Sequence, residues 1–108
     1  CLYCVVAHGA ILRIYAKDSK ISEQIATDYT KADISDRQKA MLAFAIKTAK
    51  QPAQINADDF GALHALGFGD QDIWDIGAIA ALFALSNRMA SMAAMRPNDE
   101  FYKMGRDF

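Results

Sequence analysis

The chain has 108 residues, of which 53% are hydrophobic, and a formal net charge of −1 at pH 7. This length fits one domain, residues 1–108, and the apolar content is enough to build a core. The 12 basic and 13 acidic residues are mixed along the chain, so no basic stripe indicates a nucleic-acid partner. No apolar run is long enough to cross a bilayer, so we expect no membrane partner either.

The sequence predicts helices throughout and no strand. Apolar residues without an internal proline predict a first helix over residues 2–17, and residues 19–29 predict a short second one. The third begins at Ser35, because Ser35 and Gln38 have the S-x-x-Q spacing of a capping box, and Pro52 stops it.

A fourth helix is expected after Asn56, whose side chain is a favoured N-cap. Leu63 and Leu66 are its predicted inward residues. Gly67 is expected to end it, because glycine readily adopts the left-handed conformation after a helix.

The longest element is predicted from Asp70, as its cap, towards Pro97. Residues 76–85 are apolar on every side, so this helix is expected at the centre of the fold or in a subunit interface. Trp74 is expected in the core or in the same interface. We therefore expect a homo-oligomer. One short turn is expected in the tail, and the fold class is all-α, a helical bundle with antiparallel neighbours.

The chain opens with its only two cysteines and a histidine, in the pattern C-x-x-C-x-x-x-H. On a helix, Cys1, Cys4 and His8 fall on one face, within about 60° of one another. Cys1 and Cys4 are close enough for a disulfide within the first turn, and the His8 imidazole can reach the Cys4 sulfur. A helix N-terminus and an imidazole both favour a thiolate, which can reduce a peroxide.

Other interpretations of this pattern remain. Zinc needs a fourth ligand and usually a second close pair, and the only other histidine is His64. Haem attachment requires a histidine directly after the second cysteine, where this chain has Val5. Two ordinary buried thiols beside a core histidine are also possible. Since the chain has no secretory signal and few cysteines, we expect a cytoplasmic location.

The stretch "CLYCVVAH" resembles the motif of the AhpD-like alkylhydroperoxidases, in the peroxidase-related branch of the carboxymuconolactone decarboxylase superfamily. The region from residue 34 to residue 92 is similar to the C-terminal region of that branch, including the Asn87–Arg88 pair. The resemblance implies an AhpD-like helical bundle. Because the sequence begins at Cys1, we expect it to be the C-terminal part of a longer chain.

The resemblance also implies the site. Cys4 would be the thiolate that attacks the peroxide, Cys1 its resolving partner, and His8 part of the proton relay. The family has a glutamate in this relay about three helical turns before the first cysteine, a position that precedes Cys1. The implied activity is a thiol-dependent peroxidase that acts on hydrogen peroxide or organic hydroperoxides. It would use no metal or other cofactor, and a thioredoxin-like or lipoyl-type dithiol protein would regenerate it.

Two other functions are weighed against this one. A carboxymuconolactone-decarboxylase-like enzyme would act on a lactone and would not need the cysteine pair. A non-catalytic oligomerisation module would have inert thiols. His64 is expected to be an exposed or hydrogen-bonded helix residue, and Asn87 and Arg88 either part of a polar face or a pocket or interface contact.

Overall fold

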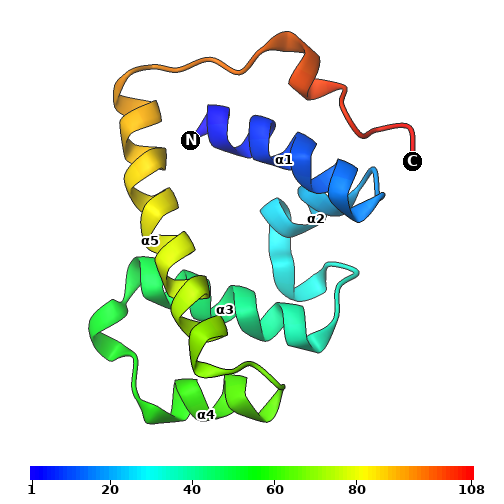
Figure 1. Cartoon of the computed structure of the whole chain (residues 1–108). Helices are drawn as coiled ribbons and strands as arrows, with labels where there is room; N and C mark the ends of the chain where they lie inside the picture. Colours follow the sequence, from blue (N-terminus) through cyan, green and yellow to red (C-terminus); the bar gives the residue numbers. More distant parts are fainter. The chain divides into compact units, whose positions relative to one another are not determined.

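The computed structural model describes the whole chain, residues 1–108, and contains helices only (Figure 1). The α-helices are α1 (Leu2–Ala16), α2 (Ile21–Asp28), α3 (Asp36–Lys50), α4 (Ala57–Ala65) and α5 (Asp70–Met92). Short 3₁₀ helices are η1 (Tyr29–Lys31), η2 (Pro52–Gln54) and η3 (Asp99–Tyr102). The predicted all-α class is confirmed, as are the helix order and the short turn in the tail. No helix is long and apolar enough to span a membrane.

Local hydrogen bonds explain where α3 and α4 begin. Ser35 Oγ accepts a bond from the Gln38 N–H at 3.1 Å, and the Gln38 side chain accepts one from the Ser35 N–H at 2.9 Å. Asn56 opens α4 in the same way, with the Asp59 carboxylate accepting from the Asn56 N–H at 2.9 Å. Both predicted N-caps are therefore confirmed.

The boundary between α4 and α5 is partly as predicted. Gly67 has φ +91° and its N–H donates to the His64 carbonyl at 3.0 Å, so it ends α4 as expected. Asp70 does not cap α5. It is the first helical residue, whereas Asp72 accepts a bond from the Gly69 N–H at 2.8 Å. The prediction for Asp70 was wrong because the capping carboxylate is that of Asp72, the third residue of the helix. It accepts from the N–H of Gly69, the residue before the helix.

The chain divides into two compact units, which we call the terminal unit and the central unit. The terminal unit combines residues 1–33 with residues 86–108, and the central unit is residues 34–85. That residues 1–108 form a single domain stays a prediction.

The core of the central unit joins α3, α4 and the start of α5. Its buried side chains are Phe44, Leu63, Phe68 and Ile73. Leu63 is inward as predicted, but Leu66 is 39% exposed. Leu66 was predicted inward from its helical spacing, yet it follows the last helical residue and is the C-cap of α4.

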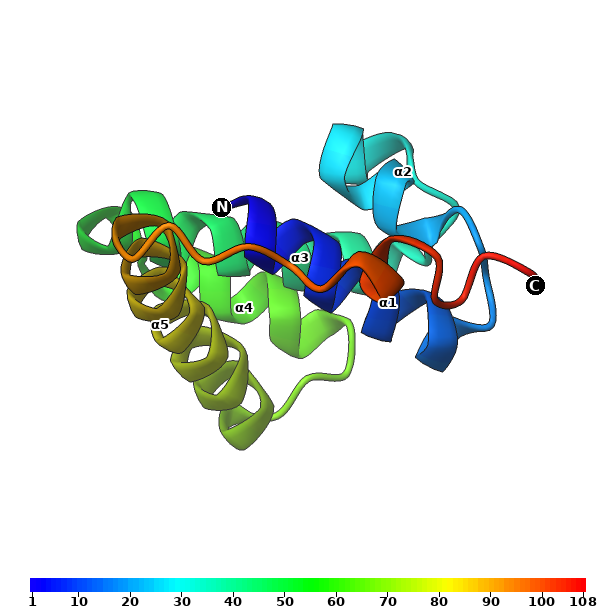
Figure 2. The ribbon, with the colours of Figure 1, turned by 90° about the horizontal axis from the view of Figure 1, so that it is seen from above.

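In the terminal unit, α1 contacts both α2 and the segment around η3. Figure 2 shows the C-terminal segment, coloured orange to red, passing along α1. Gly105 makes this approach possible, because a Cβ at this position would lie 2.7 Å from the Arg13 Cβ, and its φ of +76° also suits glycine. The tail is therefore packed against the helix that begins at Cys1.

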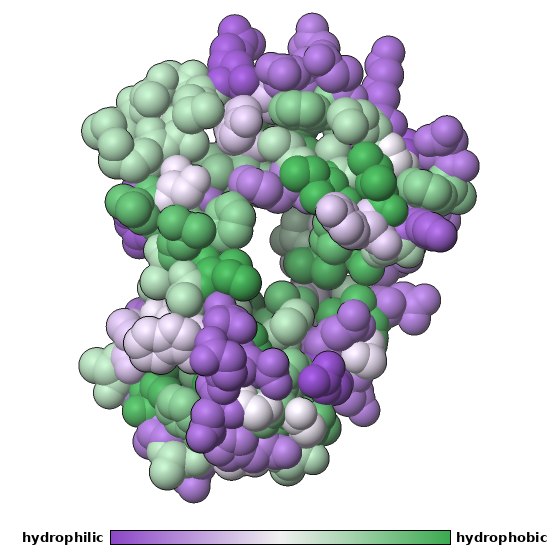
Figure 3. Space-filling view, in the orientation of Figure 1, coloured by the Kyte–Doolittle hydropathy of each residue, from purple (hydrophilic) through white to green (hydrophobic).

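Large hydrophobic side chains of α5 are exposed, and Figure 3 shows hydrophobic residues gathered over this helix. The exposed residues are Trp74, Ile79, Leu82, Leu85, Met89 and Met92. Trp74 is 73% exposed, so it is not a core residue of this chain. This exposure contradicts the prediction that α5 lies at the centre of the fold. The alternative, that α5 lies in a subunit interface, stays a prediction.

Candidate active site

Cys1, Cys4 and His8 lie together at the start of α1, as the helical spacing predicts. Cys1 is the N-cap residue, Cys4 lies in the first turn, and His8 is one turn further on. No other cysteine exists in the chain, so this is its only possible dithiol. Helix α1 alone positions all three side chains.

The two cysteines form a disulfide, with their Cα atoms 5.3 Å apart. The Cys1 sulfur also accepts a hydrogen bond from the Cys4 N–H at 3.3 Å, so it occupies the place of an N-cap side chain. Both sulfurs belong to the first turn of α1, where unpaired N–H groups and the positive end of the helix dipole favour a thiolate after reduction.

His8 binds the backbone of the same cysteine pair. Its Nδ1 lies 3.1 Å from the Cys4 carbonyl oxygen. A carbonyl only accepts, so Nδ1 carries the hydrogen and Nε2 is the nitrogen with the lone pair. The bond fixes both the position and the tautomer of the imidazole.

The two sulfurs differ in their access to solvent. Cys4 is 8% exposed, whereas Cys1 is exposed at the surface of the chain. Of the two residues, Cys1 is therefore the more accessible.

The other residues singled out from the sequence lie elsewhere. His64 is exposed on α4, and its Nε2 lies 2.7 Å from the Asp70 carboxylate, as expected for a hydrogen-bonded helix histidine. Asn87 and Arg88 lie on α5, and their role stays a prediction. No group of three or more histidine, cysteine, aspartate or glutamate side chains is placed to hold a metal ion.

Sequence reasoning missed Arg13, which is 2% exposed near the far end of α1. Its guanidinium donates to the Met104 carbonyl at 2.8 Å, the Phe101 carbonyl at 3.1 Å and Ser22 Oγ at 2.9 Å. A charged residue inside the apolar run "ILRIY" was the available signal, because buried arginines require several acceptors.

Glu23 completes this polar cluster, with Arg106 Nη2 2.7 Å from its carboxylate. Burial raises the pKa of Glu23, but the hydrogen bonds from Arg106, its own backbone N–H and Ser22 outweigh it and hold that pKa below its usual range. The cluster joins α1, α2 and the tail. It contains no contact with the cysteine pair, so we assign it to the packing of α1.

Two solved structures match the chain over nearly its whole length. One, described as an alkylhydroperoxidase AhpD core and a peroxidase-related protein of Ralstonia eutropha JMP134, is 60% identical with a TM-score of 0.97. The other, described as a peroxidase-related protein of Silicibacter sp. TM1040, is 40% identical with a TM-score of 0.94. Each match covers 98% of this chain and 56% of the other.

No family model and no curated protein sequence matches the chain. The chain spans only about half the length of the solved relatives. The resemblance seen in the sequence is confirmed by their fold and identity.

Proposed function

Since this chain has the AhpD-core fold and is a relative of peroxidase-related proteins, we propose that it is a thiol-dependent peroxidase. The observation that carries the proposal is the Cys1–Cys4 disulfide at the start of α1, with His8 hydrogen-bonded to the Cys4 carbonyl. A dithiol that closes within one helical turn, next to an imidazole of fixed tautomer, has the groups for peroxide reduction.

In the first step, His8 Nε2 accepts the proton of the Cys4 thiol. The thiolate attacks one oxygen of the hydroperoxide, and the O–O bond breaks. The departing oxygen takes the proton from His8 and leaves as water or an alcohol, while Cys4 becomes a sulfenic acid. Sulfur is oxidised by two electrons and the peroxide is reduced by two.

In the second step, the Cys1 thiol attacks the Cys4 sulfenic sulfur, which releases water and forms the disulfide. In the disulfide the Cα separation is 5.3 Å, which lies in the range usual for disulfides. A dithiol protein, thioredoxin-like or lipoyl-type, then attacks the exposed Cys1 sulfur. Cys4 leaves as the thiolate, and Cys1 is held in a mixed disulfide with the partner. The partner's second thiol then attacks its own sulfur in this bond, so that Cys1 leaves as a thiolate and the partner ends as a disulfide.

Single-turnover peroxide reduction on the full chain, followed by dimedone trapping, tests these roles. Cys4→Ser is expected to abolish the reaction, and Cys1→Ser to complete one turnover and stop as a sulfenic acid. His8→Ala is expected to slow the attack by about 10²- to 10⁴-fold. His64→Ala is the matched control, because this histidine lies on α4 and pairs with Asp70.

Two results would contradict the proposal. Sulfenic acid trapped at Cys1 in the Cys4→Ser variant would reverse the roles of the two cysteines. Peroxide reduction at the wild-type rate in the double variant, with both cysteines replaced by serine, would remove the thiol mechanism.

A further inference from the structure

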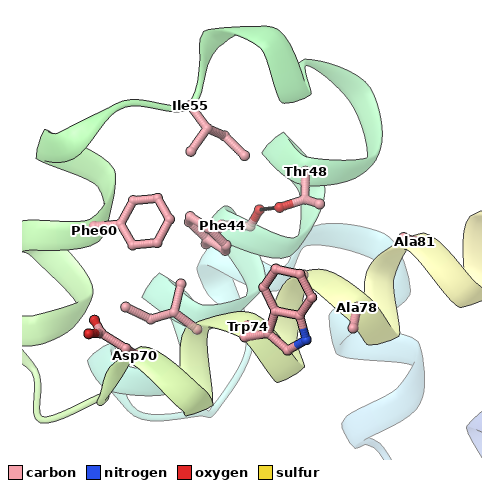
Figure 4. A pocket seen from close by; sticks show the side chains of 10 residues that line it. Phe44, Thr48, Ile55, Phe60, Asp70, Trp74, Ala78 and Ala81 are labelled. Carbon is pink, nitrogen blue, oxygen red and sulfur yellow. Dashed lines mark hydrogen bonds between the residues drawn. The ribbon is translucent and has the colours of Figure 1, made fainter.

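A second concave site lies entirely within the central unit, between α3, α4 and the first half of α5. The cavity has a volume of about 590 Å³ and is open to solvent. Figure 4 shows Phe44, Phe60 and Trp74 around one space, with Ile55 and Ala78 at its edge. This volume is sufficient for a small organic molecule.

The lining is aromatic and nearly without free hydrogen-bonding groups. Phe44 and Phe60 are in an edge-to-face contact, with ring centroids 5.8 Å apart, and Trp74 is the chain's only tryptophan. Thr48 is the uncharged polar residue of the wall, and its hydroxyl already donates to the Phe44 carbonyl at 2.9 Å. The walls therefore favour an apolar ligand that makes few hydrogen bonds.

Small residues of α5 form one wall and keep the space open. They are Gly77, Ala78 and Ala81. A Cβ at Gly77 would approach Thr48 only to 3.9 Å, so a larger side chain is sterically allowed at this position and would enter the cavity. The cavity is therefore open because Gly77 has no side chain, and not because the backbone requires a glycine there.

The charge at the rim selects between ligands. Asp70 is the only charged residue of the lining, and one of its carboxylate oxygens lies 2.7 Å from Nε2 of His64, which is outside the lining. The faces of aromatic rings also attract cations. An anionic ligand would be repelled by this carboxylate, because the lining contains no lysine or arginine to offset the negative charge.

We propose that this cavity binds a small apolar aromatic molecule that is cationic or neutral, and that it disfavours the anionic counterpart. All lining residues belong to the central unit, and the cysteine pair belongs to the terminal unit. The proposal does not depend on the peroxidase function.

Trp74 reports directly on this site, because no other tryptophan contributes to the emission. The full chain is titrated with three probes of one shape: 2-naphthylmethylamine, 2-naphthylmethanol and 2-naphthoate. We expect a saturable change in Trp74 emission with the amine and the alcohol. The amine is expected to bind about 3- to 10-fold more tightly than the carboxylate at low salt, since Asp70 is exposed and partly screened.

Matched substitutions separate cavity binding from binding elsewhere. Gly77→Leu is expected to abolish saturation, whereas Gly61→Leu, on α4 with open space around it, is expected to retain it. Ala81→Leu is a second cavity-filling variant, and Asp70→Asn is expected to reduce the preference for the amine. Isothermal titration calorimetry provides the same comparison without fluorescence.

Three results would overturn the proposal. They are the absence of saturable binding by all three probes, binding that survives in both Gly77→Leu and Ala81→Leu, and tighter binding of the carboxylate than of the amine. Circular dichroism checks that the Gly61→Leu control is correctly folded, which makes each of these results interpretable.

Discussion

At the scale of single residues, Cys1 has two functions that usually belong to different side chains. Its sulfur is one half of the disulfide and also the N-cap acceptor of α1. Cysteine is not among the favoured N-cap residues. We interpret its presence at this position as a requirement of sulfur chemistry, with helix capping as a secondary benefit.

Replacing Cys1 by serine or by alanine separates these two functions. Both variants lose the disulfide and the resolving thiol, so we expect both to stall after one turnover. Only Cys1→Ala also loses the capping atom, and we expect its α1 to be less stable than that of Cys1→Ser by about 0.5–2 kcal/mol. Urea unfolding and hydrogen exchange at the Cys4 amide check this. Equal stability of the two variants would show that the cap contributes nothing.

Arg13 is the residue on which the packing of the terminal unit most depends. Removing its side chain leaves the Phe101 and Met104 carbonyls without their donor, and Ser22 without its partner on α1. We expect Arg13→Met to lower the free energy of unfolding by about 2–4 kcal/mol. Arg13→Lys should restore little, because an ammonium cannot reproduce the planar fork of donors.

Urea unfolding measures this loss, and limited proteolysis shows whether the tail is released. Lys103→Met is the matched control, because Lys103 is an exposed cation of the same tail. Unchanged proteolysis of residues 98–108 in Arg13→Met would contradict the role assigned to Arg13.

At the scale of elements, Asp59 links the start of α4 to α3. Its carboxylate accepts from Lys47 Nζ at 2.9 Å and from the Asn56 N–H at 2.9 Å. The bond from Lys47, followed by that from Asn56, holds the pKa of Asp59 below its usual range. The ionised carboxylate therefore fixes both the cap and the helix pair.

This shift predicts a dependence of stability on pH. The stabilisation is fully present above the ordinary aspartate pKa of about 3.9 and is lost as the pH falls through the lower pKa of the folded state. We expect the urea midpoint of the wild type to fall more steeply below about pH 4 than that of Asp59→Asn. Asp58→Asn, which removes neither bond, should behave as the wild type. Parallel pH curves for the wild type and Asp59→Asn would contradict this.

The elements and the cysteine site were predictable because their causes are local. Ser35 and Gln38 are three residues apart, and Gly67 ends a helix by its own backbone preference. Cys1, Cys4 and His8 meet because of the helical period alone. A sequence displays all of these relations directly.

Features that depend on tertiary structure were not predictable in the same way. Leu66 has the right helical spacing but lies beyond the last turn of α4. The acceptors of Arg13 are separated from it by up to 91 residues, and the pocket beside Trp74 arises where three helices leave a gap. Neither periodicity nor motif spacing contains that information.

At the scale of the whole molecule, the exposed hydrophobic residues of α5 predict self-association. Leu82 is 58% and Leu85 62% exposed, and an apolar helix of this kind is normally covered. We expect a homo-oligomer by light scattering at micromolar concentration, and dissociation in a Leu82→Glu/Leu85→Glu variant. Lys50→Glu, on the exposed end of α3, is the control. A monomer mass for the wild type would contradict this.

The terminal unit is built from two separate stretches of chain, and this has a consequence for synthesis on the ribosome. Residues 34–85 are continuous, so the central unit can begin to fold as soon as it emerges. Helix α1 is made earlier, but the acceptors of Arg13 at Phe101 and Met104 are translated only after α5. The helix with the cysteine pair therefore reaches its final packing after the central unit. During this interval Arg13 of α1 lacks two of its carbonyl acceptors, so α1 is without the tail that packs against it.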